Sequence, residues 1–262
     1  MIFVLLFSGC GFSEKEEAKT PIKIAVIDTG FSSKAIPAEN VLPGKNYLDE
    51  SLSTEDTYGH GTAIASVILQ NCPDAMLVPL ISNAFDGKKI VQVDNDIFAQ
   101  MILDAVDIYE CDIINISAGL ILDKDSVRDA ILYAEEKGVL VVASVGNDFE
   151  SFGSFRYYPA GYESVFSVGS MNPDETEISA FSQRGEWVDI FVSGEDVTIK
   201  TLSGNTRKSD GTSYSAAKIT AFAAKILEES KTKPTAKELR QKVFEKASSL
   251  PDGTKYIPED YL

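Results

Sequence analysis

Residues 22–30 read IKIAVIDTG, a run of β-branched and small apolar residues that ends in an acid, a hydroxyl and a glycine. Nearly continuous apolar runs of this length are typical of strands buried on both faces of a parallel sheet. The run predicts a central strand over residues 22–27, with Asp28 at its carboxyl end. Ligands of such sheets bind beyond the carboxyl ends of the strands, so Asp28 is a candidate functional residue.

Strands and helices are predicted to alternate along the rest of the chain. Short apolar runs predict further strands over residues 75–81, 112–117, 139–144, 165–168 and 187–192. Apolar residues at helical spacing predict helices over residues 59–69, 96–109, 124–137, 213–230 and 235–247. This alternation is typical of a three-layer α/β fold, in which helices cover both faces of a mainly parallel central sheet.

Length and charge limit the classes of function. The chain has 262 residues, of which 44% are hydrophobic, and no linker or repeat divides it, so residues 21–262 are predicted to form one domain. Its formal charge is −16, from 24 basic and 40 acidic residues. We expect no nucleic-acid partner, because phosphate repulsion would have to be overcome. Attraction of cationic peptides and simple solubility both stay open as explanations of the charge.

One histidine and one serine stand out as a pair of candidate catalytic residues. The chain's single histidine, His60, lies in YGHGT at residues 58–62, and Ser213 lies in DGTSYSA at residues 210–216. A serine hydroxyl is a poor nucleophile until a base takes its proton, and an acid is needed to orient that base. Each residue alone has an ordinary structural explanation, but the order acid, base, hydroxyl favours catalysis by Asp28, His60 and Ser213.

A developing oxyanion in such a reaction would need hydrogen-bond donors. Asn147 follows the predicted strand over residues 139–144, which places it at the same edge of the sheet as Asp28. The Asn147 amide and the backbone N–H of Ser213, at a helix start, are the candidate donors.

The three cysteines give no sign of a metal site. No C-x-x-C spacing exists and histidine ligands are scarce, so no metal or cofactor is expected. For Cys72 and Cys111, two ordinary thiols are favoured over a disulfide.

The first ten residues, MIFVLLFSGC, differ from the rest of the chain. The apolar run is too short to span a bilayer as a helix, and small residues and a cysteine follow it. This pattern resembles a bacterial lipoprotein signal, which implies lipidation of Cys10, a polar tether over residues 11–20 and an extracytoplasmic position at the cell envelope. The alternatives are a frayed apolar N-terminus and a cytoplasmic protein.

Five segments together resemble the subtilisin-like serine proteases, peptidase family S8. They are residues 25–30 (AVIDTG), 59–62 (GHGT), 114–119 (INISAG), 143–147 (ASVGN) and 211–216 (GTSYSA). The resemblance covers about residues 22–248. It implies the fold of that family, a triad of Asp28, His60 and Ser213, and Asn147 as oxyanion donor.

The resemblance also implies how a substrate would be held. An extended peptide would pair with an edge and occupy a groove formed by Ser117, Ala118, Gly119, Ser144, Val145 and Gly146. Tyr157 falls where relatives often have glycine at the back of the S1 pocket, which takes the P1 side chain before the scissile bond. Bulky P1 side chains are therefore expected to be disfavoured.

These observations lead to one functional expectation with two alternatives. We expect a monomeric, membrane-anchored serine endopeptidase that cleaves peptide or protein substrates through an acyl-enzyme. One alternative is a maturation or leader-peptide protease dedicated to a single partner. The other is a catalytically silent binding module that retains the same scaffold.

Overall fold

The computed structural model describes residues 20–262. The predicted lipoprotein signal with Cys10, and residues 11–19 of the predicted tether, lie outside the described residues. Within the described part, no helix is long and apolar enough to cross a bilayer.

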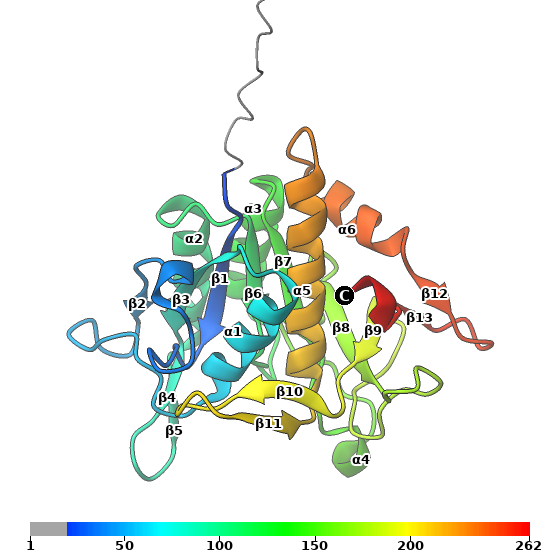
Figure 1. Cartoon of the computed structure of the whole chain (residues 1–262), viewed down its shortest axis with the longest axis horizontal. Helices are drawn as coiled ribbons and strands as arrows, with labels where there is room; N and C mark the ends of the chain where they lie inside the picture. The colour runs from blue at the N-terminus through cyan, green and yellow to red at the C-terminus, as the bar shows by residue number, and fades with distance from the viewer. Residues whose placement is uncertain (1–19) are drawn as a thin grey trace, which may run out of the picture.

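A nine-stranded sheet lies at the centre of the molecule, in the order β12-β13-β9-β8-β7-β6-β1-β3-β2 (Figure 1). Its strands are β1 (Lys23–Asp28), β2 (Lys45–Asn46), β3 (Met76–Ile81), β6 (Ile113–Ile116), β7 (Leu140–Ser144), β8 (Phe166–Met171), β9 (Ile190–Ser193), β12 (Ser248–Ser249) and β13 (Lys255–Tyr256). Neighbouring strands pair in parallel, apart from the antiparallel pair β12 and β13. The predicted mainly parallel α/β sheet is therefore confirmed.

Helices cover both faces of this sheet (Figure 1). They are α1 (His60–Asn71), α2 (Asn95–Asp107), α3 (Asp125–Glu136), the short α4 (Phe149–Phe152), α5 (Thr212–Glu229) and α6 (Ala236–Phe244), with 3-10 turns at Ala38–Asn40 and Glu259–Tyr261. The apolar side chains of β1 alternate between two cores, as strand geometry requires. Ile24 and Val26 pack with residues of α1, α5 and α6, whereas Ala25 and Ile27 pack with residues of α2 and α3.

Helix α5 has the central, buried position that its alanine-rich sequence predicts. Most of its residues are buried, and small side chains such as Ala216 and Ala217 bring its backbone close to the sheet.

The two cores on opposite faces of the sheet also explain why the two buried cysteines are not paired. Cys72 packs in the core of α1 and α5, Cys111 packs in the core of α2 and α3, and both are free thiols. The favoured interpretation of two buried thiols agrees with this arrangement.

Two antiparallel hairpins were not among the predicted elements. They are β4 (Asn83–Phe85) with β5 (Ile90–Gln92), and β10 (Val197–Lys200) with β11 (Thr206–Ser209). The second hairpin lies across the starts of α1 and α5 in Figure 1 and so borders the candidate site. Its strands are only four residues long, and its exposed strand β11 carries no apolar alternation that would mark it.

Candidate active site

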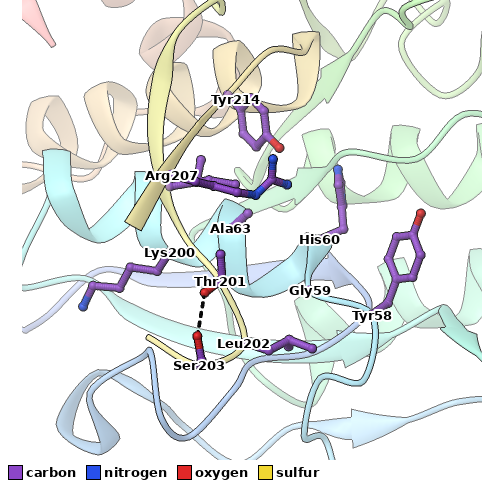
Figure 2. A pocket seen from close by; sticks show the side chains of 11 residues that line it. Tyr58, Gly59, His60, Ala63, Lys200, Thr201, Leu202, Ser203, Arg207 and Tyr214 are labelled. Atoms are coloured by element: carbon purple, nitrogen blue, oxygen red, sulfur yellow. Dashed lines mark hydrogen bonds between the residues drawn. The ribbon is translucent and has the colours of Figure 1, made fainter. Parts of the chain in front are cut away.

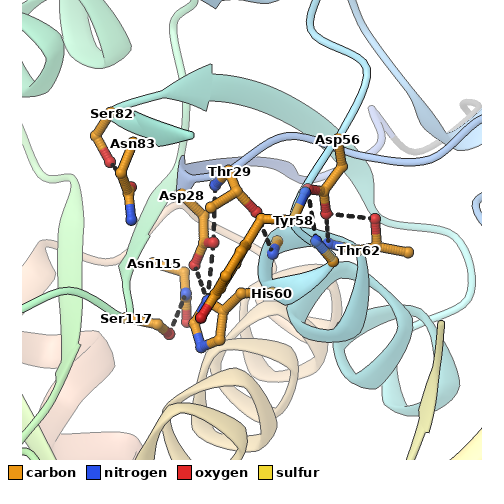
Figure 3. A network of polar contacts seen from close by, with 12 residues as sticks. Asp28, Thr29, Asp56, Tyr58, His60, Thr62, Ser82, Asn83, Asn115 and Ser117 are labelled. Carbon is orange, nitrogen blue, oxygen red and sulfur yellow. Dashed lines mark hydrogen bonds and ion pairs between the residues drawn. The ribbon is translucent and has the colours of Figure 1, made fainter. Parts of the chain in front are cut away.

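His60, which is partly exposed, and the buried acid Asp28 form a close pair (Figure 3). Asp28 is the last residue of β1 and His60 is the first of α1, and His60 Nδ1 lies 2.8 Å from each carboxylate oxygen of Asp28. Only 2% of the Asp28 surface is exposed, and the backbone N–H of Thr29 donates a further hydrogen bond of 2.8 Å to Oδ1. The carboxylate therefore fixes the imidazole with Nδ1 as donor and leaves Nε2 for other chemistry.

A second buried acid, Asp56, holds the start of α1 in place. Its Oδ1 accepts hydrogen bonds of 2.8 Å from the backbone N–H groups of Tyr58 and Gly59. Its Oδ2 accepts hydrogen bonds from the Thr62 N–H at 2.9 Å and the Thr62 hydroxyl at 2.6 Å. Gly59 has φ of 104°, which favours glycine directly before His60. Asp56 was not among the predicted site residues, although an acid just before a helix start is a signal for such a contact.

The environment of His60 raises its pKa above the ordinary value of histidine. Burial alone would lower the pKa, but the charge of Asp28, its hydrogen bond to the ring and the charge of Asp56 outweigh burial. Negative charge close to the ring therefore stabilises the imidazolium that forms when His60 takes a proton.

Ser213 lies in the first turn of α5, where it lines a cavity of about 260 Å³. We call this space the Ser213 cavity. His60 lines a separate cavity of about 620 Å³, the His60 cavity, together with Tyr214, the residue that follows Ser213. The start of α5 thus lies beside the start of α1, with one residue of the pair 213–214 at each cavity.

Asn147 lines the Ser213 cavity. Its Oδ1 accepts hydrogen bonds of 2.9 Å from both the backbone N–H and the hydroxyl of Thr212. Because this oxygen accepts two hydrogen bonds, the other terminal atom of the side chain must be the NH₂ group, which lies close to Gly211. Within residues 20–262, Asn147 Nδ2 has no hydrogen-bond partner, so it can donate to a group bound beside Ser213.

The predicted substrate groove is only partly reproduced by the Ser213 cavity. Its lining includes the following predicted residues: Ser117, Gly119, Ser144, Gly146 and Tyr157. Ala118 and Val145 do not line it, because their side chains pack against the core of α2 and α3. The lining alternates along both segments, since Ser117 and Gly119, and Ser144 and Gly146, line the cavity while the residues between them do not.

Buried Asn115 supports the edge predicted at residues 117–119. Its amide Nδ2 donates to the Ser117 hydroxyl at 3.1 Å, and its Oδ1 accepts from the Thr220 hydroxyl at 2.9 Å. Beyond this edge, Leu120 and Tyr158 pair through two backbone hydrogen bonds. Residues 117–119 are thus held between the central helix and a short antiparallel bridge.

The ring of Tyr157 is wedged between two glycines of the Ser213 cavity. A Cβ on Gly146 would lie 2.7 Å from this ring, and one on Gly119 would lie 3.2 Å from it. The Tyr157 hydroxyl donates a hydrogen bond of 2.9 Å to Asp148 Oδ2. Burial and this contact with Asp148 raise the pKa of Tyr157, so the phenol stays neutral. The Tyr157 ring thus fills the space between the two glycines, and Asp148 also lines the cavity.

Across residues 20–262, no group of three or more His, Cys, Asp or Glu side chains is arranged to hold a metal ion. The chemistry that the site offers is that of an oriented imidazole, a hydroxyl at a helix start and a free amide donor.

Comparison with known proteins identifies the family. The sequence profile of the subtilase family matches residues 19–259. Subtilisin BL of Lederbergia lenta is 32% identical over 215 residues, which are 78% of this chain and 76% of that protein. A thermophilic serine proteinase of Bacillus sp. (strain AK1) is 27% identical over 242 residues, which are 89% of this chain but only 59% of that protein.

A similar fold is found among solved structures. A lanthipeptide protease superimposes with a TM-score of 0.78 at 24% sequence identity, covering 88% of this chain and 82% of that chain. At this identity the likeness concerns the fold. The profile match and the identity to subtilisin BL extend over most of the chain. On these grounds, the chain belongs to the subtilase family.

Proposed function

We propose that this protein is a serine endopeptidase that hydrolyses peptide bonds through an acyl-enzyme. Ser213 is the nucleophile, His60 the general base and acid, and Asp28 the group that orients His60. The observation that carries the proposal is the contact of His60 Nδ1, at 2.8 Å, with both oxygens of buried Asp28. It leaves Nε2 as the basic nitrogen, which is the tautomer that this reaction needs.

The reaction proceeds in two halves. His60 takes the proton of the Ser213 hydroxyl while the oxygen attacks the carbonyl carbon of the scissile peptide. His60 then gives the proton to the leaving amine, the C–N bond breaks, and the acyl group stays on Ser213. A water molecule attacks the acyl-enzyme by the same route and releases the acid, which restores Ser213.

Asn147 Nδ2 and the backbone N–H of Ser213 are the proposed donors to the oxyanion. Asn147 suits this role because Thr212 holds its oxygen and leaves its NH₂ group toward the cavity. The loss of one such donor costs about 2.7–4 kcal/mol of transition-state stabilisation, a figure known from subtilisin, a member of the same family.

Labelling with a fluorophosphonate probe tests the nucleophile. We expect the native protein to be labelled and Ser213→Ala to be unlabelled, with peptide hydrolysis reduced by about 10⁶-fold, the loss known from subtilisin itself. Ser51→Ala is the matched control, because Ser51 is an exposed serine whose hydroxyl donates a hydrogen bond to Asp49. Labelling of folded Ser213→Ala at the native rate would remove Ser213 from its role. An unlabelled native protein would favour the silent binding module instead.

A dedicated maturation or leader-peptide protease is the second candidate. The position of the Tyr157 ring between Gly119 and Gly146 favours it, since a P1 site narrowed by this ring admits few side chains. Cleavage of many unrelated peptides would favour the general endopeptidase over this candidate.

We also propose that Cys10 carries a lipid that anchors the protein to the bacterial envelope. The support is the sequence alone, namely the apolar run and small residues that precede Cys10. After expression of the full chain in a bacterium, the native protein should enter the detergent phase of a phase-separating detergent, and Cys10→Ala should stay in the aqueous phase. Equal partitioning of both proteins into water would contradict the anchor.

A further inference from the structure

The reaction itself decides which part of a substrate each cavity receives, if the proposed function holds. His60 must pass its proton to the leaving amine, so the leaving segment lies beside His60. The His60 cavity therefore receives the residues that follow the scissile bond. The Ser213 cavity, which contains the free amide of Asn147, receives the P1 residue on the acyl side.

The His60 cavity has the opposite charge to the molecule as a whole. The protein carries 40 acidic and 24 basic residues, yet the lining of this cavity includes Lys200 and Arg207 and no acid. The Lys200 ammonium is engaged elsewhere, since it donates a hydrogen bond of 3.0 Å to the carbonyl of Ala35. Figure 2 shows this side chain extending away from His60.

Arg207 is the cation that faces the cavity. Its guanidinium lies between the Tyr214 side chain and the His60 ring in Figure 2. Hydrogen-bond register explains the direction, because Arg207 pairs with Ile199 across the β10–β11 hairpin, and residues directly opposite share a face. Ile199 is buried and lines the same cavity, so Arg207 is held on the cavity side of the hairpin.

The guanidinium of Arg207 has no ion pair or hydrogen bond with any side chain or backbone group of residues 20–262. The nearby Tyr214 hydroxyl donates a hydrogen bond of 3.0 Å to the Ser209 hydroxyl. An arginine offers a planar fork of donors that fits a carboxylate through two parallel hydrogen bonds. The unpaired guanidinium of Arg207 in the His60 cavity can therefore bind a carboxylate of the substrate.

We propose that Arg207 selects substrates with a carboxylate on the first or second residue after the scissile bond. The carboxylate is either the side chain of Asp or Glu or the free carboxyl terminus of a short leaving segment. Both sources present a carboxylate to Arg207. A side-chain carboxylate can lie within a long peptide, whereas a terminal carboxylate requires a short leaving segment.

Quenched fluorescent peptides test the proposal. All have the same residues before the scissile bond, with alanine at P1. Glu, Gln or Lys is placed at the first or second position after the scissile bond, in long peptides with an amidated end. We expect kcat/KM to be about 2–5-fold higher for Glu than for Gln at one of these positions, as suits an exposed charged contact. A second series, with two-residue leaving segments that end in a free carboxylate or an amide, tests the terminal carboxylate.

Variants of the hairpin assign the preference to one residue. Arg207→Gln should reduce the Glu/Gln ratio, or the ratio of free to amidated ends, to about one, and Arg207→Lys should retain part of it. Lys208→Gln is the matched control. It removes the same charge from the next residue of β11, which faces the other side of the hairpin, and should leave the ratio unchanged.

The outcomes separate this inference from the proposed function. A native ratio near one in both series, or a native-sized ratio in folded Arg207→Gln, overturns the role of Arg207. Normal fluorophosphonate labelling of Arg207→Gln would show that the nucleophile is intact, so such a result leaves the endopeptidase standing. Absence of both labelling and cleavage in the native protein would instead refute the endopeptidase.

Discussion

The start of α5 lines both the Ser213 cavity, through Ser213, and the His60 cavity, through Tyr214, and the two cavities are built in different ways. The first is small, about 260 Å³, and is formed by segments that follow the carboxyl ends of β6 and β7. The second is larger, about 620 Å³, and one of its walls is the β10–β11 hairpin. The first contains an acid, Asp148, and the second contains a free cation, Arg207.

This difference indicates two kinds of selection on one substrate. In the Ser213 cavity, the Tyr157 ring contacts two backbone segments and excludes large side chains by volume. In the His60 cavity there is more room, so charge is the stronger discriminator. We expect this protease to require a small P1 residue before the scissile bond and to prefer an acid after it.

Removal of the Tyr157 ring should change the substrate preference more than the other variants, because it opens the P1 site in the Ser213 cavity. In Tyr157→Gly, the space between Gly119 and Gly146 opens, and we expect the kcat/KM ratio of a phenylalanine P1 to an alanine P1 to rise by about 10–200-fold. Cleavage rates of two otherwise identical quenched peptides measure the ratio.

Tyr157→Phe is the matched control for this experiment. It keeps the ring and loses only the hydroxyl that donates to Asp148, so the preference for a small P1 should persist. An unchanged ratio in folded Tyr157→Gly would mean that the Tyr157 ring is not what limits P1 size. The two cavities would then differ in their selection of substrate by charge alone.

The sequence predicted the residues at the strand ends better than those of the β10–β11 hairpin, for a physical reason. Asp28, Asn115 and Asn147 are placed by parallel strands, and a buried apolar run reveals where such a strand ends. The strand boundaries also predict that these residues share one edge of the sheet. The closeness of His60 and Asp28 follows from this edge together with the start of α1.

Arg207 and Asp56 could not be found in the same way. Arg207 reaches the His60 cavity through the register of a short hairpin, and the alternation of one exposed four-residue strand does not predict that register. Asp56 acts through a loop whose backbone N–H groups turn toward its carboxylate, a contact that apolar periodicity does not report. The cross-strand register of Arg207 therefore required coordinates, whereas Asp56 was signalled only by the presence of an acid shortly before a helix start.

Asp56 allows a smaller test, on the His60 side of the comparison. His60 must be neutral to act as a base, so kcat/KM should fall as pH drops through its pKa. Because the charges of Asp28 and Asp56 raise that pKa, the acid limb of the pH profile should lie above the ordinary histidine value. Asp56→Asn removes one of these charges and should move the midpoint of the limb to lower pH.

The direction of this shift separates an electrostatic role of Asp56 from a purely structural one. In Asp56→Asn an NH₂ group faces the donors of Thr62, so the free energy of unfolding should fall by about 1–3 kcal/mol. A purely structural role would lower kcat at every pH and leave the midpoint of the limb in place. Asp252→Asn is the control, since it removes an exposed turn acid that accepts a hydrogen bond from the N–H of Thr254. It should change neither kcat nor the midpoint of the acid limb. A lower midpoint would mean that the charge of Asp56 acts on the proton of His60, as well as on the position of its helix.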